Sequence, residues 1–505
     1  MEGKNKNVIA RSKSDEAISK DVIALPFDKL RARNDSLPEL PKGWVWTRLG
    51  EVSEIILGQS PPSSTYNKNG NGLPFYQGKL EFGNIYPTPQ KWCTAPKKIA
   101  EKEDVLISVR APVGPTNISP ERCCIGRGLA AIRGLGGIET LFILYLMRAF
   151  EPNLAGKRTG TTFDAITGDV LKEFAIPLPP LPEQHRIVAK IEELFTKLDA
   201  GVEALKKVKA QLKRYRQAVL KYAFEGKLTE EWREKHKNEL EPASVLLERI
   251  REERKKNTKG SNVGATGRSP LPVDTSDFPE LPEGWVWTRV GEICHVISGQ
   301  TPEGINNYSS DGEIPYFKVG DMNKSGNEKY MFYSDIALAL ADLKKLGLRI
   351  QDKGTVIFPK RGGAIATNKK RILAQPSAYD LNIMGVYPLI MPYMSFYCWI
   401  LSIDLIKLSD GSNVPQINHS DIEPLIFPLP SLPEQYKIIE EIERRFSVAD
   451  NIEKFVEQSL KQAERLRQSI LKKAFEGKLV PQNAIDEPAE KLLERIKLEK
   501  NRGRN

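Results

Sequence analysis

Cysteine is scarce in this chain, which has five cysteines among 505 residues and no Cys-x-x-Cys spacing. This count and spacing argue against a disulfide framework and against a zinc site built on paired cysteines. They are typical of proteins in a reducing compartment, so we expect a cytoplasmic location.

Several catalytic motifs are also missing from the sequence. There is no Gly-x-x-x-x-Gly-Lys-Ser/Thr loop for ATP, no His-Glu-x-x-His motif, and no Asn/Asp-Pro-Pro-Tyr/Phe segment of the adenine-methyltransferase type. The four histidines do not cluster at metal-ligand spacing. We therefore predict a chain that is not an enzyme by itself, with no metal site and no cofactor.

Long hydrophobic runs are rare. Residues 383–403 are apolar enough to raise the question of a membrane span, but they contain Pro388 and Pro392. A buried core element is the favoured interpretation, and we expect no membrane association. The first residues lack the apolar core of a secretory signal.

Positive charge is in excess. The chain has 75 Lys and Arg against 65 Asp and Glu, a net charge of +10, and a pI near 9.1. A basic protein favours a polyanionic partner, most often nucleic acid. The alternative is a basic surface without function. Hydrophobic residues make up 40% of the chain, enough for real cores.

An internal repeat organises the sequence. Ten of thirteen positions are identical between the two copies of the first motif, and two further motifs recur at a constant offset. The three motif pairs are Leu40–Val52 with Leu281–Ile293, Pro177–Gln184 with Pro428–Gln435, and Ala223–Leu228 with Ala474–Leu479. The chain is one module written twice.

Each copy contains a helix of more than forty residues. In both, apolar residues recur mostly at steps of three or four and form a narrow stripe, which requires a partner helix. Pro182 suits the first turn of such a helix and Gly226 suits its end. We predict an antiparallel intramolecular coiled coil with these interface residues: Ile187, Ile191, Leu194, Leu198, Leu205, Leu212, Ile438, Ile442, Phe446, Ile452, Val456, Leu466 and Ile470.

The predicted fold class is α+β with a pseudo-two-fold internal repeat. Short apolar runs broken by Gly and Pro indicate strands within each globular block, and 139–150 is a plausible helix. Residues 229–250 are expected to be helical, and 254–270 to be a flexible linker. The expected divisions are an N-terminal extension (1–36), a first block (37–178), a long helix (179–228), a helical segment with linker (229–275), a second block (276–429), a second long helix (430–479) and a helical tail (480–505).

The motifs resemble those of the specificity subunit of type I restriction-modification systems, over nearly the whole chain. The resemblance is carried by Gly43–Trp46 and Gly284–Trp287 with Gly58–Pro61 and Gly299–Pro302, by the Leu-Pro-x-Leu-Pro-Glu-Gln helix starts, and by the Ala-Phe-x-Gly-Lys-Leu helix ends. Any one motif alone would be weak, whereas their order, repeated twice around long helices, is specific.

This resemblance implies two target-recognition domains, each a mixed α/β unit with a small curved sheet that reads half of a split DNA sequence. It implies that the long helices set the spacer and dock two adenine-methyltransferase subunits, and that restriction/translocase subunits join them. S-adenosylmethionine, ATP and Mg²⁺ would then belong to partner subunits, and double-stranded DNA would be the target. About 42 helical residues span roughly 63 Å, nearly two turns of DNA.

DNA contacts are expected from basic and hydroxyl residues on loops of the two blocks, because Arg can reach guanine and Lys mostly anchors phosphate. Each is also explained equally well as a solvated surface charge. The candidates are Lys79, Arg110, Lys157, Arg158, Thr161 and Thr162 in the first block, and Lys318, Lys324, Lys360, Arg361, Lys369, Lys370 and Arg371 in the second.

Three alternatives remain open from sequence. The Trp-x-Trp pairs are expected to pack in the core, although Trp also stacks on exposed bases. The chain as a whole is also compatible with a structural coiled-coil scaffold carrying two protein-binding heads. A third possibility is a self-contained nuclease or methyltransferase with an unrecognised site.

Overall fold

The computed structural model describes residues 37–155, 165–258 and 278–502. The chain divides into two compact units, the first made of residues 1–205 and 458–505 and the second of residues 206–457. The two longest helices, α6 (Leu181–Phe224) and α13 (Leu432–Phe475), each run from one unit into the other. Each unit therefore contains the start of one long helix and the end of the other.

The first unit holds a block of short strands and helices. A two-stranded antiparallel sheet pairs β1 with β11, a four-stranded sheet has the order β2-β10-β7-β8, and a five-stranded sheet has the order β3-β5-β4-β9-β6. Its strands are β1 (Val45–Arg48), β2 (Ser53–Leu57), β3 (Tyr66–Asn67), β4 (Leu73–Tyr76), β5 (Trp92–Cys93), β6 (Ile99–Ala100), β7 (Val105–Ser108), β8 (Thr116–Ile118), β9 (Cys123–Ile125), β10 (Leu129–Gly134) and β11 (Ala175–Leu178). Its short helices are α2 (Leu49–Val52), α3 (Thr140–Ala149), α4 (Glu151–Ala155), α5 (Gly168–Lys172) and α14 (Ala489–Arg502).

The second unit repeats this plan. β12 pairs with β21, a five-stranded sheet has the order β13-β20-β17-β18-β15, and a three-stranded sheet has the order β16-β14-β19. Its strands are β12 (Val286–Arg289), β13 (Cys294–Ser298), β14 (Ile314–Phe317), β15 (Tyr330–Met331), β16 (Ile336–Leu338), β17 (Val356–Pro359), β18 (Arg371–Leu373), β19 (Ala378–Tyr379), β20 (Ile383–Pro388) and β21 (Ile426–Leu429). Its short helices are α7 (Glu230–His236), α8 (Ala243–Thr258), α9 (Val290–Ile293), α10 (Leu340–Lys345), α11 (Tyr393–Ile400) and α12 (His419–Ile422).

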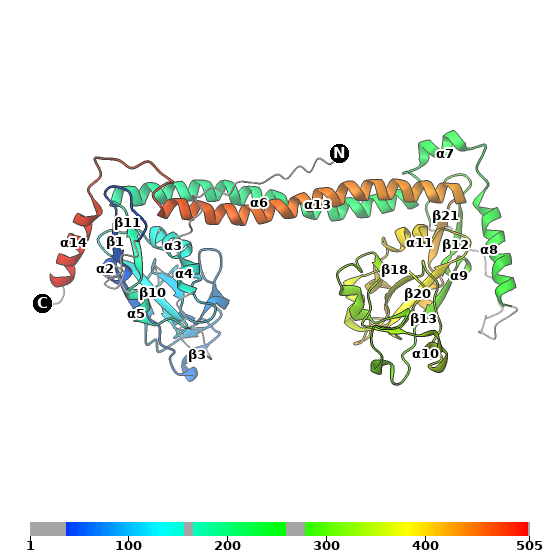
Figure 1. The fold of residues 1–505 in the computed structure, drawn as a ribbon, viewed down its shortest axis with the longest axis horizontal. Coiled ribbons are helices and arrows are strands. Elements are labelled where there is room, and N and C mark those ends of the chain that lie inside the picture. The colour runs from blue at the N-terminus through cyan, green and yellow to red at the C-terminus, as the bar shows by residue number, and fades with distance from the viewer. Residues whose placement is uncertain (1–36, 156–164, 259–277, 503–505) are drawn as a thin grey trace, which may run out of the picture. The chain divides into compact units, whose positions relative to one another are not determined.

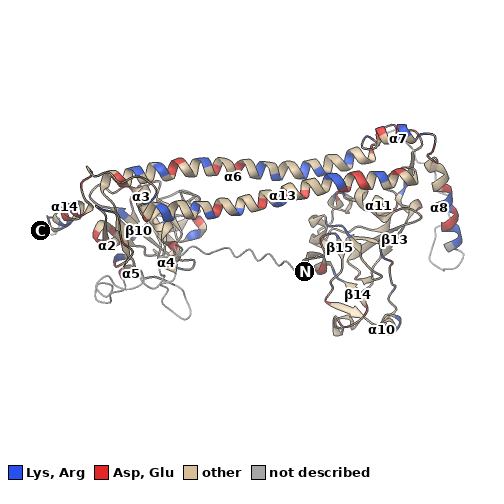
Figure 2. Ribbon diagram, turned by 45° about the horizontal axis from the view of Figure 1, so that its top comes forward, with Lys and Arg blue, Asp and Glu red and all other residues tan. Residues whose placement is uncertain are grey.

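The predicted α+β class with two mixed blocks and two long antiparallel helices is confirmed, although each block contains three small sheets rather than one. Within each unit, α6 and α13 lie side by side (Figure 1). In the first unit Ile187 and Ile191 share a core cluster with Ile470 and Ala474. Charged residues of both signs follow one another along the two helices (Figure 2).

The burial of the predicted coiled-coil residues corrects two of them. Ile187, Ile191, Leu212, Ile438, Ile442, Val456 and Ile470 are buried, and Leu194, Leu198, Leu205 and Phe446 are partly buried. In contrast, Ile452 is 41% and Leu466 49% exposed, so their assignment to the interface is wrong. The regular spacing instead places Ala449 and Arg467 in line with Val456 and Ile470, and Ala449 is 1% exposed.

Charged residues occupy part of the helix interface. In the second unit Arg216 of α6 pairs with Asp450 at 2.7 Å and with Glu453 at 2.8 Å. In the first unit Arg467 pairs with Asp199, and its guanidinium lies 4.4 Å from the ring centre of Phe195. In each unit these pairs connect α6 with α13 across the helix interface.

Two sequence predictions outside the blocks need revision. The segment expected to be helical from 229 to 250 is two helices, α7 and α8, separated by residues 237–242, in which Pro242 directly precedes α8. α8 then continues to Thr258, so the start of the expected linker is helical. The N-terminal extension and residues 259–277 lie outside the described residues.

The apolar segment 383–403 forms strand β20 and helix α11, both largely buried, as the core interpretation predicted. None of the helices in the described part of the chain combines the length and apolarity that a membrane span requires.

Candidate nucleic-acid interface

Arg110 and Arg361 occupy the same place in the two blocks, two residues after the ends of β7 and β17. Both side chains are exposed. Their backbones make equivalent isolated bridges, Arg110 to Ala165 and Arg361 to Gln416. The guanidinium groups are therefore presented by the same rigid frame in each block, which suits bidentate contact with phosphate or guanine.

Three lysines of the second block are tied to neighbouring polar groups. Lys318 Nζ donates to Asn306 Oδ1 at 2.6 Å, and Lys369 donates to Asn323. Lys324 pairs with two carboxylates, Asp321 at 2.7 Å and Asp335 at 2.5 Å. Because its charge is already balanced, Lys324 is the weakest of these as a ligand for an anion.

The structure contradicts Lys370 as a DNA contact. Its side chain is 1% exposed, and its Nζ donates to Asn368 Oδ1 at 2.7 Å and to the carbonyl of Ile403 at 2.6 Å. Burial lowers the pKa of Lys370 to about 8. Adjacent residues near a strand point to opposite sides, so a run of basic residues such as 369–371 cannot all face solvent.

Arg371 is partly buried and uses its guanidinium internally. Nη1 donates to the carbonyl of Lys370 at 2.9 Å and Nη2 to that of Met322 at 3.3 Å. Burial lowers the pKa of Arg371. This residue is better placed to hold the loop before β15 than to reach a ligand, and its role in DNA contact stays a prediction.

In the first block, Lys79 is exposed at the start of a short 3-10 helix. The remaining candidates of this block, Lys157, Arg158, Thr161 and Thr162, lie outside the described residues. Of the first-block set, the structure thus places Lys79 and Arg110, both on the surface.

Lys360 belongs to a polar cluster that the sequence prediction missed in part. Its Nζ donates to Ser298 Oγ at 2.9 Å, and the same oxygen lies 3.0 Å from His419 Nε2. Burial lowers the pKa of Lys360, and the nearby charge of Arg361 adds to this effect. An alignment of the two copies could have pointed to this cluster. Ser298 and His419 are polar, whereas the first copy has Leu57 and Gly168 at the same positions.

The repeated motifs meet beside each block. Trp44 Nε1 donates to Glu183 Oε2 at 3.0 Å in the first unit, and Trp285 Nε1 donates to Glu434 Oε2 at 2.7 Å in the second. Both tryptophans are 6% exposed, so these two pack in the core as predicted. Burial raises the pKa of Glu183, and its hydrogen bond to Trp44 opposes that rise. The Gly-Trp motif therefore anchors the helix that begins with the Pro-Glu-Gln motif.

The third motif comes from the other copy. Gly477, after α13, lies against Pro41, and Gly226, after α6, lies against Pro282. The helix that follows the third motif makes a similar contact with the other copy. In the first unit, Ala489 N at the start of α14 donates to the carbonyl of Gly43 at 3.0 Å. In the second unit Ala243 N donates equivalently to the carbonyl of Gly284 at 2.8 Å. Each block is thus held by residues of both copies.

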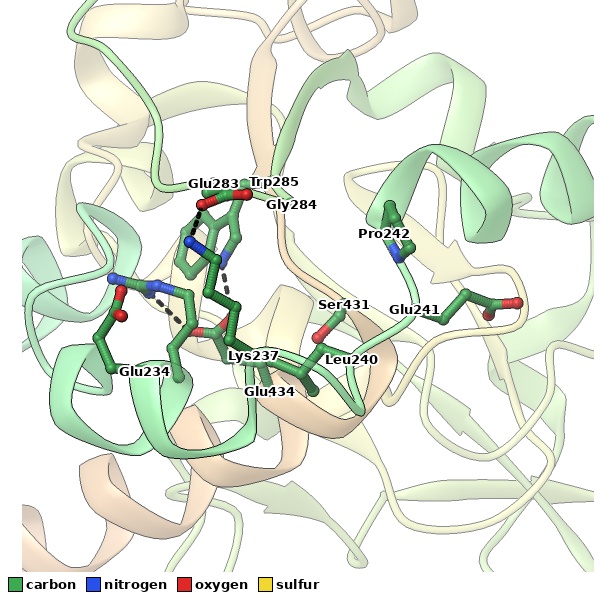
Figure 3. Close-up of a pocket in the computed structure, with 11 residues that line it drawn as sticks. Glu234, Lys237, Leu240, Glu241, Pro242, Glu283, Gly284, Trp285, Ser431 and Glu434 are labelled. Atoms are coloured by element: carbon green, nitrogen blue, oxygen red, sulfur yellow. Dashed lines mark hydrogen bonds and ion pairs between the residues drawn. The ribbon is translucent and has the colours of Figure 1, made fainter.

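The junction of the second unit contains a buried ion pair at Glu434, which Figure 3 labels beside Trp285. Arg233 Nη1 lies 2.7 Å from Glu434 Oε1, and their side chains are 11% and 1% exposed. Thr229 Oγ1 donates to the same oxygen at 2.7 Å. A cavity of about 260 Å³ adjoins these residues. The carboxylate is fully satisfied, so the cluster serves to fasten α7 to the start of α13.

The described ranges offer neither a metal-ligand cluster nor an exposed cysteine thiol. No three His, Cys, Asp or Glu residues there converge as metal ligands. All five cysteines are buried. Burial raises the pKa of Cys123 to about 11 and of Cys398 to about 12, which keeps these thiols protonated and unreactive.

Comparison with known proteins identifies the family. Residues 41–214 and 282–462 match the type I restriction modification DNA specificity domain. The putative type I restriction enzyme MjaX specificity subunit of Methanocaldococcus jannaschii is 38% identical over 228 residues, which cover 44% of this chain and 53% of that relative. The type I restriction enzyme EcoDI specificity subunit of Escherichia coli is 23% identical over 489 residues, which cover 92% of this chain and 97% of that relative.

A solved structure from work on complex assembly and conformational transition of the type I R-M system is similar in fold. Its TM-score is 0.63 at 20% identity, covering 88% of this chain and 100% of that chain. At this identity the likeness concerns the fold alone.

Proposed function

Because this chain belongs to the type I restriction-modification DNA specificity family, we propose that it is the non-catalytic DNA-reading subunit of such an enzyme, and that each block binds one half of a bipartite double-stranded target. The observation that carries this proposal is the equivalent presentation of Arg110 and Arg361 by two blocks that share a frame. The two arginines have equivalent backbone positions, while the rest of each block differs in sequence. This arrangement suits two domains that bind different DNA sequences.

The net charge of +10 supports a DNA target. Exposed Arg and Lys neutralise phosphates and supply affinity without sequence preference, while base contacts supply the specificity. Lys79, Arg110 and Arg361 are exposed, and Lys318, Lys360 and Lys369 are partly exposed. Together they provide cations for both roles.

We further propose that α6 and α13 set the spacer between half-sites and dock two adenine-methyltransferase subunits. An exposed apolar stripe on α13 supports docking, because Val448, Ile452 and Phe455 recur at helical spacing and are 53%, 41% and 64% exposed. On α6 of the same unit, Tyr215 and Tyr222 are 41% and 51% exposed. Exposed apolar patches of this kind mark protein interaction sites.

The chemistry would then belong to partners. S-adenosylmethionine would be held by the methyltransferase subunits, and ATP with Mg²⁺ by restriction/translocase subunits that join them. The site of action would be the cytoplasm, where the host DNA lies.

The test is to reconstitute the full chain with its methyltransferase subunits and to map the adenines they methylate. The expected result is a single bipartite sequence with a fixed spacer. Inserting seven residues into both α6 and α13 lengthens each helix by about 10 Å, so the spacer is expected to change while both half-sites stay the same. Methylation without sequence preference, or by the isolated chain, would overturn the proposal.

A further inference from the structure

Three positions in each block stand at equivalent places around the strand ends. They are the last residue of β2 or β13, the residue that follows β7 or β17, and the first residue of α5 or α12. The backbone confirms the equivalence, because Ile166 N donates to the carbonyl of Val109 at 3.0 Å and Ile417 N to that of Lys360 at 2.9 Å. We call them the strand-end positions: Leu57 and Ser298, Val109 and Lys360, and Gly168 and His419.

In the second block the strand-end positions are polar and mutually bonded. A lysine ammonium can only donate, so Ser298 Oγ accepts from Lys360 Nζ at 2.9 Å. The serine hydroxyl hydrogen is then available for His419 Nε2 at 3.0 Å. Glu423 Oε1 lies 3.8 Å from the other ring nitrogen of His419. This chain of contacts fixes the ammonium of Lys360 and leaves it two further N–H donors.

In the first block the same positions are apolar. A Cβ atom at Gly168 would lie 2.6 Å from Leu57 Cδ1, so the leucine packs over the glycine. Leu57 is nevertheless 42% exposed, and Val109 is 5% exposed. An aliphatic side chain held at the surface thus stands where the second block holds a cationic cluster.

The strand-end positions adjoin the two equivalent arginines. Val109 precedes Arg110 and Lys360 precedes Arg361 in the chain. In the second block, no ion pair joins Lys360 to a carboxylate of the described residues, and the charge of Arg361 acts on it. Lys360 and Arg361 are adjacent cations, and Lys360 is partly desolvated. Such a pair is suited to bind a partner rich in hydrogen-bond acceptors.

We propose that the strand-end positions determine which base each block reads. This rests on the proposed function. Lys360, positioned by Ser298 and His419, donates to O6 and N7 of a guanine in the half-site of the second block. Leu57 contacts the 5-methyl group of a thymine in the half-site of the first block. These are the acceptor pattern and the apolar group that Lys and aliphatic side chains recognise in the major groove.

The test replaces the strand-end residues of the second block with those of the first block. A full-length chain carrying Ser298→Leu, Lys360→Val and His419→Gly is reconstituted with the methyltransferase subunits. Methylation is then measured on duplexes in which each base pair of one half-site is varied while the other is kept. We expect the preference for one G·C pair in the second half-site to fall about 10- to 100-fold. Unchanged discrimination at the first half-site reports that the variant is folded and assembled.

Two single variants separate positioning from contact. His419→Gln keeps an acceptor for the Ser298 hydroxyl and is expected to retain most of the guanine preference, whereas His419→Ala is expected to weaken it. Lys360→Met removes the donors and is expected to abolish the preference. A purely structural role for His419 would give no difference in base preference between the glutamine and alanine variants.

Two outcomes would overturn the assignment. If Lys360→Met weakens binding equally for all sequences and reduces the salt dependence by about one phosphate contact, Lys360 anchors the backbone instead of reading a base. If the exchange leaves every base preference unchanged, the strand-end positions do not determine specificity. Failure of the wild-type complex to select any bipartite sequence would instead overturn the proposed function.

Discussion

Pro41 lies directly against Gly477, so that a Cβ atom on this glycine would approach Pro41 Cγ to 2.2 Å. Gly226 and Pro282 repeat the relationship at 2.3 Å. Both glycines also have positive φ, 67° and 71°, as the residue after a helix often does. The helix end of one copy is therefore fitted to the first motif of the other copy.

Replacing Gly226 by Ala is expected to destabilise the second unit by about 2 kcal/mol or more, because it combines an unfavourable φ with the clash on Pro282. Gly201→Ala is the matched control. Gly201 lies within α6 with open space around its Cα, so alanine there should stabilise by about 0.5–1 kcal/mol. Denaturant unfolding of both variants checks the opposite signs; equal effects would contradict the close contact.

Replacing Glu434 by Ala leaves Arg233 buried without its partner and Trp285 without an acceptor. Removal of one member of a buried ion pair costs about 3–5 kcal/mol. Glu183→Ala should cost less, since the groups that bond Glu183 are the neutral side chains of Trp44 and Gln482. Hydrogen exchange of peptides from α7 and the start of α13 would locate the loss.

The stability of the second unit should depend on pH through Lys370. Its pKa is about 8 in the folded chain, against an ordinary value of 10.5. Between these values the unfolded chain holds a proton that the folded chain has released, so the free energy of unfolding rises with pH in this window. Lys370→Met should remove about 1–3 kcal/mol of that rise. Urea unfolding of both proteins at pH 7.5 and 10 gives the comparison, and parallel changes would contradict it.

Arg110→Ala and Arg361→Ala should each weaken recognition by about 1–3 kcal/mol. Each loss should concern its own half-site, because the two arginines belong to separate blocks. Lys324→Ala is the control, since its ammonium is already balanced by Asp321 and Asp335. Competition with duplexes altered in one half-site measures the effect. A loss from Lys324→Ala as large as that from Arg361→Ala would argue against Arg361 as a contact.

Charged substitutions on the apolar stripe of α13 should weaken docking. Ile452→Asp with Phe455→Asp is expected to reduce binding of one methyltransferase subunit at least tenfold without unfolding the chain, as both side chains are exposed. In the first unit the positions equivalent to Val448, Ile452 and Phe455 hold Lys197, Gly201 and Ala204, so the stripe is not repeated there. Asn451→Asp adds charge beside the stripe and should have little effect. Measuring the mass of the assembled complex distinguishes one bound subunit from two.

The long helices were predictable because their ends are marked by local chemistry. Pro182 lies in the first turn of α6 and Gly226 follows its end, as expected. The residues of the helix interface were harder to predict. Ile452 and Leu466 are large and apolar but exposed, whereas the small residue Ala449 is buried. Where a helix also carries a second apolar stripe that faces outward, the size of a side chain does not tell which stripe it belongs to.

The candidate site was predictable only in part. The exposed place of Arg110 and Arg361 followed from their position after an apolar strand, and their contact with DNA stays a prediction. Lys370 could not be recognised as buried, because its environment comes from Asn368 and the distant carbonyl of Ile403. The association of Lys360 with Ser298 and His419 likewise depends on residues 62 and 59 positions away, brought together only by folding.

The strand that leads into each block is hydrogen-bonded to the strand that leads out of it. Val45 is paired with Leu178 in the first block, and Val286 with Leu429 in the second. The polypeptide thus leaves the helical framework and returns to it at neighbouring points. A foreign cassette bounded by these two strands could replace the original by recombination while the sequences of the long helices α6 and α13 stay unchanged.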